Sequence, residues 1–401
     1  EPYRRQRQMC IRDRDIYMSN EMNVGIVADW LVSYAGAERV IKEMIDIYPD
    51  SKLYAVIDFL SNNARENFHG KQAETTFIQK MPYSKTSYQK YLPLMPLAIE
   101  QLDVSEHEIL LSSSHAVAKG ILSGPDQLHI SYVHSPIRYA WDLQHQYLRE
   151  SNLNKGLKGL IAKYLLHKIR MWDYRTANGV DYFVANSNFI ARRIKKVYAR
   201  HADVIYPPVN VERFPLKSTK DDFYFTASRL VPYKRIDLIV EAFSQMPNKR
   251  LVVIGDGPEM SKIKAKASSN IEVLGYQKDD VMLECMQNAK AFVFAAEEDF
   301  GITPVEAQAC GTPVIAFGKG GGLETVRPYG TNNPTGVFFD KQSVTDIINA
   351  VHQFECLADK IDPVDCRQNS LRFSSEVFKK TMSDYVESRW KEFKSTKTII
   401  Y

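Results

Sequence analysis

Long apolar runs are missing from this sequence, and cysteine is scarce. No stretch approaches the roughly 20 consecutive apolar residues that a membrane-spanning helix needs. The five cysteines among 401 residues form no CxxC pair and have no histidine partners at zinc-site spacing. The N-terminus also lacks the apolar core of a secretory signal. These absences argue against a disulfide or zinc framework and predict a cytoplasmic protein in a reducing compartment.

A large excess of one charge sign is absent as well, since the formal net charge is +4. The content of 44% hydrophobic and 25% charged residues is typical of soluble globular proteins. The length is sufficient for two domains of ordinary size. No nucleic-acid partner is expected.

Metal-binding motifs are also lacking. The one Asp-x-Asp of the chain, Asp13 to Asp15, falls within residues 1–21, which show no periodicity and precede a clean strand pattern beginning at Asn23. We interpret residues 1–21 as a non-native or disordered tail, with Met18 or Met22 as the natural start. No metal site is predicted.

Strand and helix patterns alternate from Asn23 onward, in two series separated by the proline-containing segment YPPVNVERF (206–214). Strands are predicted at 23–31, 108–114, 129–135 and 180–187, and then at DFYFTASR, RLVVIGDG, NIEVLG, KAFVFAA, TPVIAF and TGVFFD. Apolar stripes predict buried helix faces at Val40, Ile41, Met44, Ile45 and Tyr48, and at Ile236, Ile239, Val240 and Phe243.

This alternation predicts an α/β protein whose parallel sheets are covered by helices on both faces. We expect two doubly wound, Rossmann-like domains, residues 22–208 and 209–380, that face each other across a cleft. The C-terminal helix, about 380–401, is expected to pack back on the first domain. Ligands of such sheets bind at the carboxyl ends of the strands.

Two acids mark one of these strand ends. Glu298 follows the apolar run KAFVFAA, and Glu306 lies about one turn inside a helix predicted from Ile302 to Cys310. The helix N-terminus between them offers unpaired N–H groups to an anion. Acids beside an anion site suit a ligand with both hydroxyls and phosphates, such as a sugar nucleotide. Taken alone, the pattern also fits an ordinary turn with two solvated acids.

Other strand ends carry cations, glycines and a histidine. Arg229 and Lys234 stand five apart on one strand–helix turn and could clamp a diphosphate, although a solvated basic turn would look the same. Gly36 would let the backbone approach phosphate, and GDGP (255–258) ends another strand. His134 ends the strand HISYVHS, where a lone histidine is more often structural.

In combination, these motifs carry a resemblance. SRLVPYK, GDGP, EEDFGITPVEAQACGTPVIA and GGGLETV, in this order and spacing, resemble the GT-B retaining glycosyltransferases of family 4 over residues 23 to about 395. YVHSPIRYAWD and VIYPPVNVERF resemble a subgroup of bacterial mannosyltransferases that build O-antigen and related polysaccharides. The chain departs from the family at Ala35-Gly36, where two glycines are frequent.

The resemblance implies roles for single residues. Glu306 would hold the ribose hydroxyls of a nucleotide-sugar donor, and Arg229 and Lys234 would neutralise its diphosphate. Glu298 and His134 would contact the transferred sugar. The catalytic residues implied are His134, Glu298, Arg229 and Lys234, the donor-binding residues are Gly36, Arg229, Lys234, Gly257, Phe300, Gly301, Ile302 and Glu306, and the acceptor-side residues are Arg138 and Asp142.

The implied function is retaining transfer of a hexose, with mannose from GDP-mannose as donor and a glycan or polyprenyl-diphosphate-linked acceptor. No further cofactor is implied, so fixed cations and helix N-termini would stabilise the leaving diphosphate. Alternatives are the same fold with a UDP-sugar donor, a sugar-nucleotide epimerase, a phosphorylase (normally much longer), or a silent subunit that supports a partner transferase.

Residues 151–178 interleave basic and apolar side chains. Lys155, Lys158, Lys163, Lys168, Arg170 and Arg175 oppose the single acid Asp173, with Leu, Ile, Tyr and Trp between them. A basic amphipathic helix can lie on an anionic membrane surface. This pattern predicts peripheral contact with the inner face of the plasma membrane, and the alternative is a solvated helix packed on its own domain.

Overall fold

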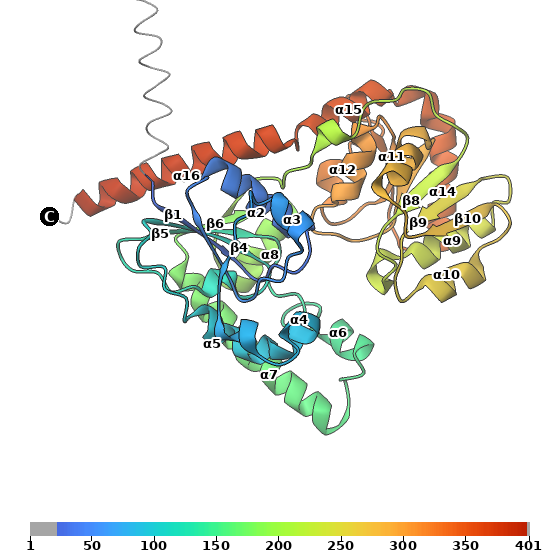
Figure 1. The fold of residues 1–401 in the computed structure, drawn as a ribbon. Coiled ribbons are helices and arrows are strands. Elements are labelled where there is room, and N and C mark those ends of the chain that lie inside the picture. The colour runs from blue at the N-terminus through green and yellow to red at the C-terminus, as the bar shows by residue number, and fades with distance from the viewer. Residues whose placement is uncertain (1–21, 399–401) are drawn as a thin grey trace, which may run out of the picture. The chain divides into compact units, whose positions relative to one another are not determined.

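A computed structural model describes residues 22–398 of the protein (Figure 1). The predicted tail and its Asp13-x-Asp15 lie outside these residues. The described chain divides into two compact units. Unit 1 comprises the described residues up to Asn186, Ile190–Ile205 and the described residues from Lys379 onward, and unit 2 comprises Ser187–Phe189 and Tyr206–Phe378.

Unit 1 contains a parallel seven-stranded sheet of order β3-β2-β1-β4-β5-β6-β7 within the described residues. Its strands are β1 (Val24–Ala28), β2 (Lys52–Ala55), β3 (Glu74–Thr75), β4 (Ile109–Ser114), β5 (Leu128–Val133), β6 (Tyr182–Ala185) and β7 (Ala202–Val204). The central strands β1, β4 and β5 are buried along their whole length, as expected of a sheet covered on both faces.

Helices connect these strands. They are α2 (Gly36–Ile47), α3 (Asn62–Glu66), α4 (Ser84–Ser87), α5 (Met95–Ile99), α6 (Gln144–Glu150), α7 (Gly156–Thr176), α8 (Asn188–Tyr198) and the C-terminal α16 (Ser375–Thr398). The predicted stripe of α2 is confirmed, because its five apolar residues through Tyr48 are buried. From Lys379 onward α16 belongs to unit 1, where Tyr385 donates a hydrogen bond to Asp203 of β7 at 2.8 Å.

Unit 2 contains a parallel six-stranded sheet, again within the described residues, of order β10-β9-β8-β11-β12-β13. Its strands are β8 (Tyr224–Ala227), β9 (Leu251–Ile254), β10 (Ile271–Gly275), β11 (Ala291–Phe294), β12 (Val314–Phe317) and β13 (Gly336–Phe339). Its helices are α9 (Ile236–Ser244), α10 (Met260–Lys266), α11 (Asp279–Asn288), α12 (Ile302–Ala309), α13 (Gly322–Thr325), α14 (Val344–Leu357) and α15 (Pro363–Leu371).

The core of unit 2 lies on both faces of this sheet. The predicted stripe of α9 is confirmed, since Ile236, Ile239, Val240 and Phe243 are buried with residues of α14 against one face. Val305 of α12 belongs to a second buried cluster that includes Phe225 and Phe292. Truncation of a fully buried phenylalanine such as Phe243 to alanine typically costs about 3–5 kcal/mol.

Each sheet has a point where the strand order reverses. In unit 1 the chain builds outward from β1 on one side and from β4 on the other, and in unit 2 it does so from β8 and β11. Connections leave adjacent strands in opposite directions there, which opens a crevice beyond their carboxyl ends. The two reversal points, β1/β4 and β8/β11, are therefore the expected ligand sites of the two units.

Candidate functional site

The reversal point of unit 2 brings together two predicted site residues. Lys234 ends the 3-10 turn Pro232–Lys234 after β8, and Glu298 follows β11. Their side chains form a close ion pair and are only 16% and 19% exposed. The alternative of a solvated basic turn does not hold for Lys234, because its side chain is paired and mostly buried. Arg235, with φ of 56°, separates the turn from α9, and the Lys234 side chain folds inward onto Glu298.

The glycine loop after β12 packs directly on the backbone that carries Glu298. The Gly321 N–H donates to the Glu298 carbonyl at 2.7 Å. A Cβ at Gly320 would lie 2.4 Å from that carbonyl oxygen, and one at Gly321 would lie 2.3 Å from the Phe300 Cα. Read alone, GGGLETV would be a flexible loop, but its glycines allow a close approach that fixes the position of Glu298.

The N-terminus of α12 lies a few residues after Glu298 in the chain. Gly301 adopts φ of 87°, which favours glycine, and α12 begins at Ile302. The Phe300 ring is buried against Tyr206 and Phe373, so this residue can offer a ligand only its backbone. Glu306 is 6% exposed inside α12. The predicted anion site between Glu298 and Glu306 thus has a helix N-terminus at its centre.

Arg229 and Gly257 lie at neighbouring strand ends. Arg229 follows β8 and is exposed. Gly257 follows β9 with φ of 156°, and a Cβ there would lie 2.4 Å from the Leu230 carbonyl oxygen. The GDGP turn therefore packs closely on the segment between Arg229 and Lys234.

His134 lies at the corresponding edge of unit 1. It follows β5, and its Nε2 is 2.8 Å from the hydroxyl of Ser113 on β4. Burial lowers the pKa of His134 to about 3, so its ring is neutral at physiological pH. A neutral ring bonded to Ser113 keeps one nitrogen to face a sugar hydroxyl. Gly36 begins α2 after β1, where the Glu38 carboxylate accepts the Ala35 N–H at 3.0 Å.

Two residues at this edge escaped the sequence analysis. Asp29, directly after β1, is buried and accepts hydrogen bonds from the backbone N–H groups of residues 115–118. His115, directly after β4, places its Nδ1 2.9 Å from the Asp29 carboxylate. His115 directly follows the predicted strand 108–114, and this position was a signal that could have identified it. Asp29 fell inside the predicted strand 23–31, because the structure ends β1 at Ala28.

The predicted acceptor-side residues lie in the segment after His134. The Arg138 Nε donates to the Ser135 hydroxyl at 3.3 Å. Asp142 is exposed and pairs with Arg193 of α8 at 2.6 Å. Ser135 and Arg193 are thus among the partners that hold these two side chains in place.

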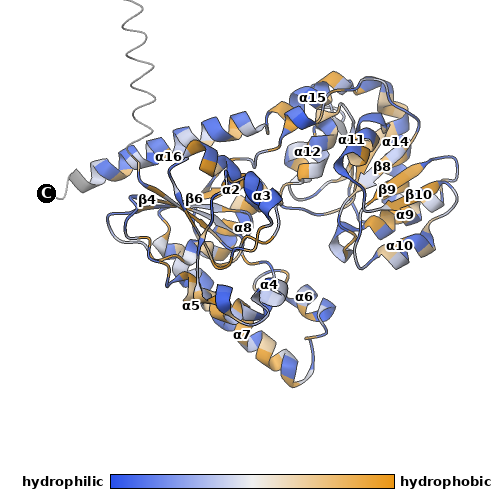
Figure 2. Ribbon diagram, viewed as in Figure 1, coloured by the Kyte–Doolittle hydropathy of each residue, from blue (hydrophilic) through white to orange (hydrophobic). Residues whose placement is uncertain are grey.

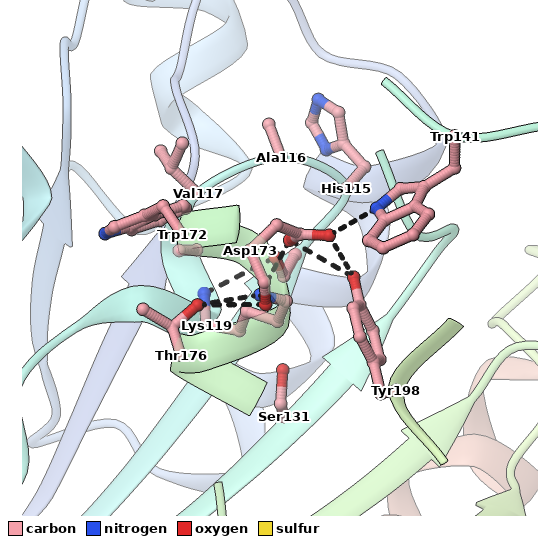
Figure 3. Close-up of polar contacts among 12 residues, drawn as sticks. His115, Ala116, Val117, Lys119, Ser131, Trp141, Trp172, Asp173, Thr176 and Tyr198 are labelled. Carbon is pink, nitrogen blue, oxygen red and sulfur yellow. Dashed lines mark hydrogen bonds and ion pairs between the residues drawn. The ribbon is translucent and has the colours of Figure 1, made fainter. Parts of the chain in front are cut away.

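Helix α7 is anchored by a buried ion pair (Figure 3). Lys119 and Asp173 are both fully buried, with the Lys119 Nζ 2.7 Å from the carboxylate. Trp141 and Tyr198 also donate to Asp173. The sequence analysis took Asp173 only as the acid of a basic surface, which was wrong. Removing one member of such a pair leaves an uncompensated buried charge, which typically costs about 3–5 kcal/mol.

Gly159 and Ile169 of α7 are also buried, but one face of its N-terminal half is exposed. Figure 2 shows apolar and polar residues alternating along it. Leu157 is 74% exposed, and Leu160, Ile161 and Tyr164 follow on the same face at helical spacing, all more than half exposed. The predicted amphipathic helix thus packs on unit 1 near Asp173, and its apolar side chains near Leu157 are exposed to solvent.

Residues 22–398 contain no group of three His, Cys, Asp or Glu side chains placed to hold a metal ion. Over the same residues, none of the helices combines the length and apolarity needed to cross a bilayer.

The segment that contains the Lys234–Glu298 pair is similar in sequence to known proteins. Residues 209–372 match the sequence profile described as glycosyl transferases group 1. We call residues 209–372 the group 1 domain, after the profile that they match. The resemblance stated from the sequence motifs is confirmed for it.

Curated relatives of the group 1 domain include two mannosyltransferases. A GDP-mannose-dependent monoacylated alpha-(1-6)-phosphatidylinositol monomannoside mannosyltransferase of Corynebacterium glutamicum is 32% identical over 180 residues, which is 37% of this chain and 47% of that protein. A GDP-mannose-dependent alpha-(1-6)-phosphatidylinositol monomannoside mannosyltransferase of Mycolicibacterium smegmatis is 32% identical over 145 residues, 31% of this chain and 36% of that protein. The chain thus matches half or less of these two relatives' lengths.

The fold extends the similarity beyond the group 1 domain. The crystal structure of Anabaena HepE in complex with UDP matches with a TM-score of 0.68 and 17% identity, covering 92% of this chain and all of that one. The predicted fold class, two doubly wound α/β domains of the GT-B type, is confirmed.

Proposed function

We propose that this protein is a retaining hexosyltransferase that moves mannose from GDP-mannose to a glycan or lipid-linked acceptor in cell-surface polysaccharide synthesis. The observation that carries the proposal is the Lys234–Glu298 ion pair at the β8/β11 reversal point of the group 1 domain. A sugar diphosphate offers each member of this pair a new partner, an oxyanion for the ammonium and hydroxyls for the carboxylate.

In the proposed reaction, the diphosphate leaves with growing negative charge while the sugar passes through an oxocarbenium-like state. Arg229, Lys234 and the N–H groups at Phe300, Gly301 and Ile302 stabilise that charge without a metal ion. Glu306 holds the ribose hydroxyls. The acceptor hydroxyl attacks from the face that the diphosphate leaves, and a phosphate oxygen takes its proton.

The remaining roles belong to the other strand ends. Gly257 and Gly36 allow close backbone approach to the donor. His134 offers a neutral ring to the transferred sugar. Arg138 and Asp142 belong to the acceptor side.

GDP-mannose as the donor is supported by the two mannosyltransferase relatives, which are both GDP-mannose-dependent. The alternative is a UDP-sugar, because the HepE structure contains UDP. A thermal-shift panel of GDP, UDP and ADP and their sugars on the purified protein separates the two. We expect GDP and GDP-mannose to raise the melting temperature most. A response to UDP ligands with none to GDP would refute the mannosyl assignment.

Donor hydrolysis without an acceptor tests whether the protein is an enzyme. Slow release of GDP and mannose from GDP-mannose is expected of a transferase whose acceptor is replaced by water. An epimerase would instead change the sugar and leave the nucleotide attached, and a silent subunit would do neither.

We also propose that α7 contacts an anionic membrane at the cytoplasmic face, which would suit a polyprenyl-diphosphate-linked acceptor. The exposed stripe Leu157, Leu160, Ile161 and Tyr164 supports this. Lys155, Lys158, Lys163 and Lys168 lie beside it in the sequence. Apolar burial in the headgroup region and attraction of lysines to anionic lipid act together in such helices.

A further inference from the structure

Asp29 is a carboxylate whose hydrogen-bonding capacity is used within the protein. Four backbone N–H groups, from His115 to Ala118, donate to its two oxygens at 2.5–3.0 Å, and the His115 Nδ1 lies 2.9 Å away. Asp29 itself is 1% exposed. With five donors around it, this carboxylate has little capacity left for a ligand. Asp29 would therefore influence a ligand by orienting and charging the His115 ring that it contacts.

The position of the His115 ring is fixed from two sides. Its Nδ1 faces Asp29, and its ring lies edge-on to Trp30 at 4.6 Å between centroids. The side chain nevertheless remains 32% exposed. Because the carboxylate takes Nδ1–H, Nε2 is the ring nitrogen left to meet a ligand. His115 directly follows β4, at the β1/β4 reversal point where a ligand of unit 1 is expected.

Charged and titratable groups reach His115 from each neighbouring element. Burial alone would lower the pKa of His115, and the positive charge of Arg138 lowers it further. Asp29 after β1 and Glu38 of α2 have the opposite effect, and the net result is a raised pKa. His134, 6.3 Å away between ring centroids, has its pKa lowered to about 3, with burial as the main cause and His115 as a further one. The pKa values of two adjacent histidines are thus moved in opposite directions, a pattern typical of sites that divide donor and acceptor roles.

We propose that His115, held by Asp29 through Nδ1 at the β1/β4 reversal point, donates a hydrogen bond from Nε2 to a phosphate oxygen of a substrate, and that a bound phosphate favours the protonated ring. A charge-assisted bond of this kind is roughly twice as strong as a neutral one. The ligand group that His115 would bind is a diphosphate. Two substrates could supply it, the nucleotide-sugar donor or a polyprenyl-diphosphate acceptor. The identity of these substrates rests on the proposed function, but the phosphate chemistry of His115 does not.

The experiment is an NMR titration of the histidine rings of the full chain, with the His115 signal assigned through His115→Gln. Inorganic pyrophosphate is the probe common to both sources, GDP represents the donor, and farnesyl diphosphate represents the lipid acceptor. Pyrophosphate should shift the His115 titration to higher pH and leave that of His201, an exposed histidine of the same unit, in place. If GDP shifts the His115 titration, His115 binds the diphosphate of the donor. If farnesyl diphosphate shifts it, His115 binds the diphosphate of the lipid acceptor.

His115→Gln provides the second measurement. It retains a hydrogen-bond donor but loses the charge, and it should weaken binding of the assigned diphosphate by about 10-fold or more. The affinity loss should be larger at pH 6 than at pH 9, since only the wild-type ring gains charge on acidification. Asp29→Asn should lower the pKa of His115, and circular dichroism would show whether this variant folds.

An unmoved His115 titration with all three probes, or unchanged affinities in His115→Gln, would overturn the proposal. Wild-type protein that binds neither GDP nor UDP would instead count against the proposed transferase, whatever His115 does with pyrophosphate.

Discussion

Lys234 and Glu298 form an ion pair at the carboxyl ends of the adjacent strands β8 and β11. The pair places a cation and an acid of the group 1 domain side by side, at the point where its strand order reverses. A ligand that separates them must satisfy both charges, and this requirement leads to the first prediction.

Lys234→Ala should lower the transfer rate by about two orders of magnitude, as for the loss of one preorganised donor to a developing anion. Because the pair is largely buried, the variant should also lose stability through an unpaired Glu298. The measurements are kcat/KM with GDP-mannose and the melting temperature. Lys262→Ala is the matched control, since Lys262 forms exposed ion pairs in the same unit. Near-normal turnover of Lys234→Ala would refute its role.

Metal independence is the second prediction. Built-in cations and the α12 N-terminus are proposed to stabilise the leaving diphosphate, so activity should survive excess EDTA. The measurement is donor turnover before and after chelation. Activity lost to EDTA and restored by magnesium or manganese would contradict it.

Membrane contact through α7 is the third prediction. The protein should co-sediment with anionic liposomes at low salt and be released at high salt, because screening weakens attraction between lysines and lipid. Leu157→Ser with Leu160→Ser, or charge reversal at Lys155, Lys158 and Lys163, should reduce co-sedimentation and leave GDP binding intact.

The matched control for the serine variants is Leu122→Ser, which changes a 58% exposed leucine elsewhere on unit 1. It should not affect co-sedimentation. If wild-type protein does not co-sediment with anionic liposomes at low salt, α7 is a solvated helix. Soluble glycans are then the acceptors to test.

Acid sensitivity of unit 2 is the fourth prediction. Burial alone would raise the pKa of Glu355, but Tyr224, Lys290 and Lys249 hold it at about 2. A lowered carboxylate pKa contributes stability that is fully present above the ordinary value near 4.5 and is lost as the pH falls toward 2.

Glu355→Gln should therefore cost roughly 1–3 kcal/mol at pH 7, measured by denaturant unfolding. The difference from wild type should narrow as the pH falls from 7 toward 3. Glu272→Gln removes an acid from an exposed pair with Arg250 and should have little effect. A difference that does not change with pH would mean that the charge of Glu355 is not responsible.

The sequence by itself determined the α/β class and the positions of most strands and helices. Periodic burial is a local property, so the stripes of α2 and α9 could be recognised without knowledge of their partners. Motifs at strand ends could also be recognised, because parallel sheets place those ends at one edge whatever the strand order. For this reason Arg229, Lys234, Glu298 and Glu306 were found together.

Contacts between distant segments were decided only by the tertiary structure. The strand order brings β8 beside β11, and with it Lys234 against Glu298. It also brings β1 beside β4, so that the loop after His115 closes around Asp29, a residue with no distinguishing pattern of its own. Asp173 had the sequence context of a surface acid, yet it is buried because Lys119, far away in the chain, pairs with it. Charge pairing over such separations depends on packing in three dimensions, which the local pattern of residues does not encode.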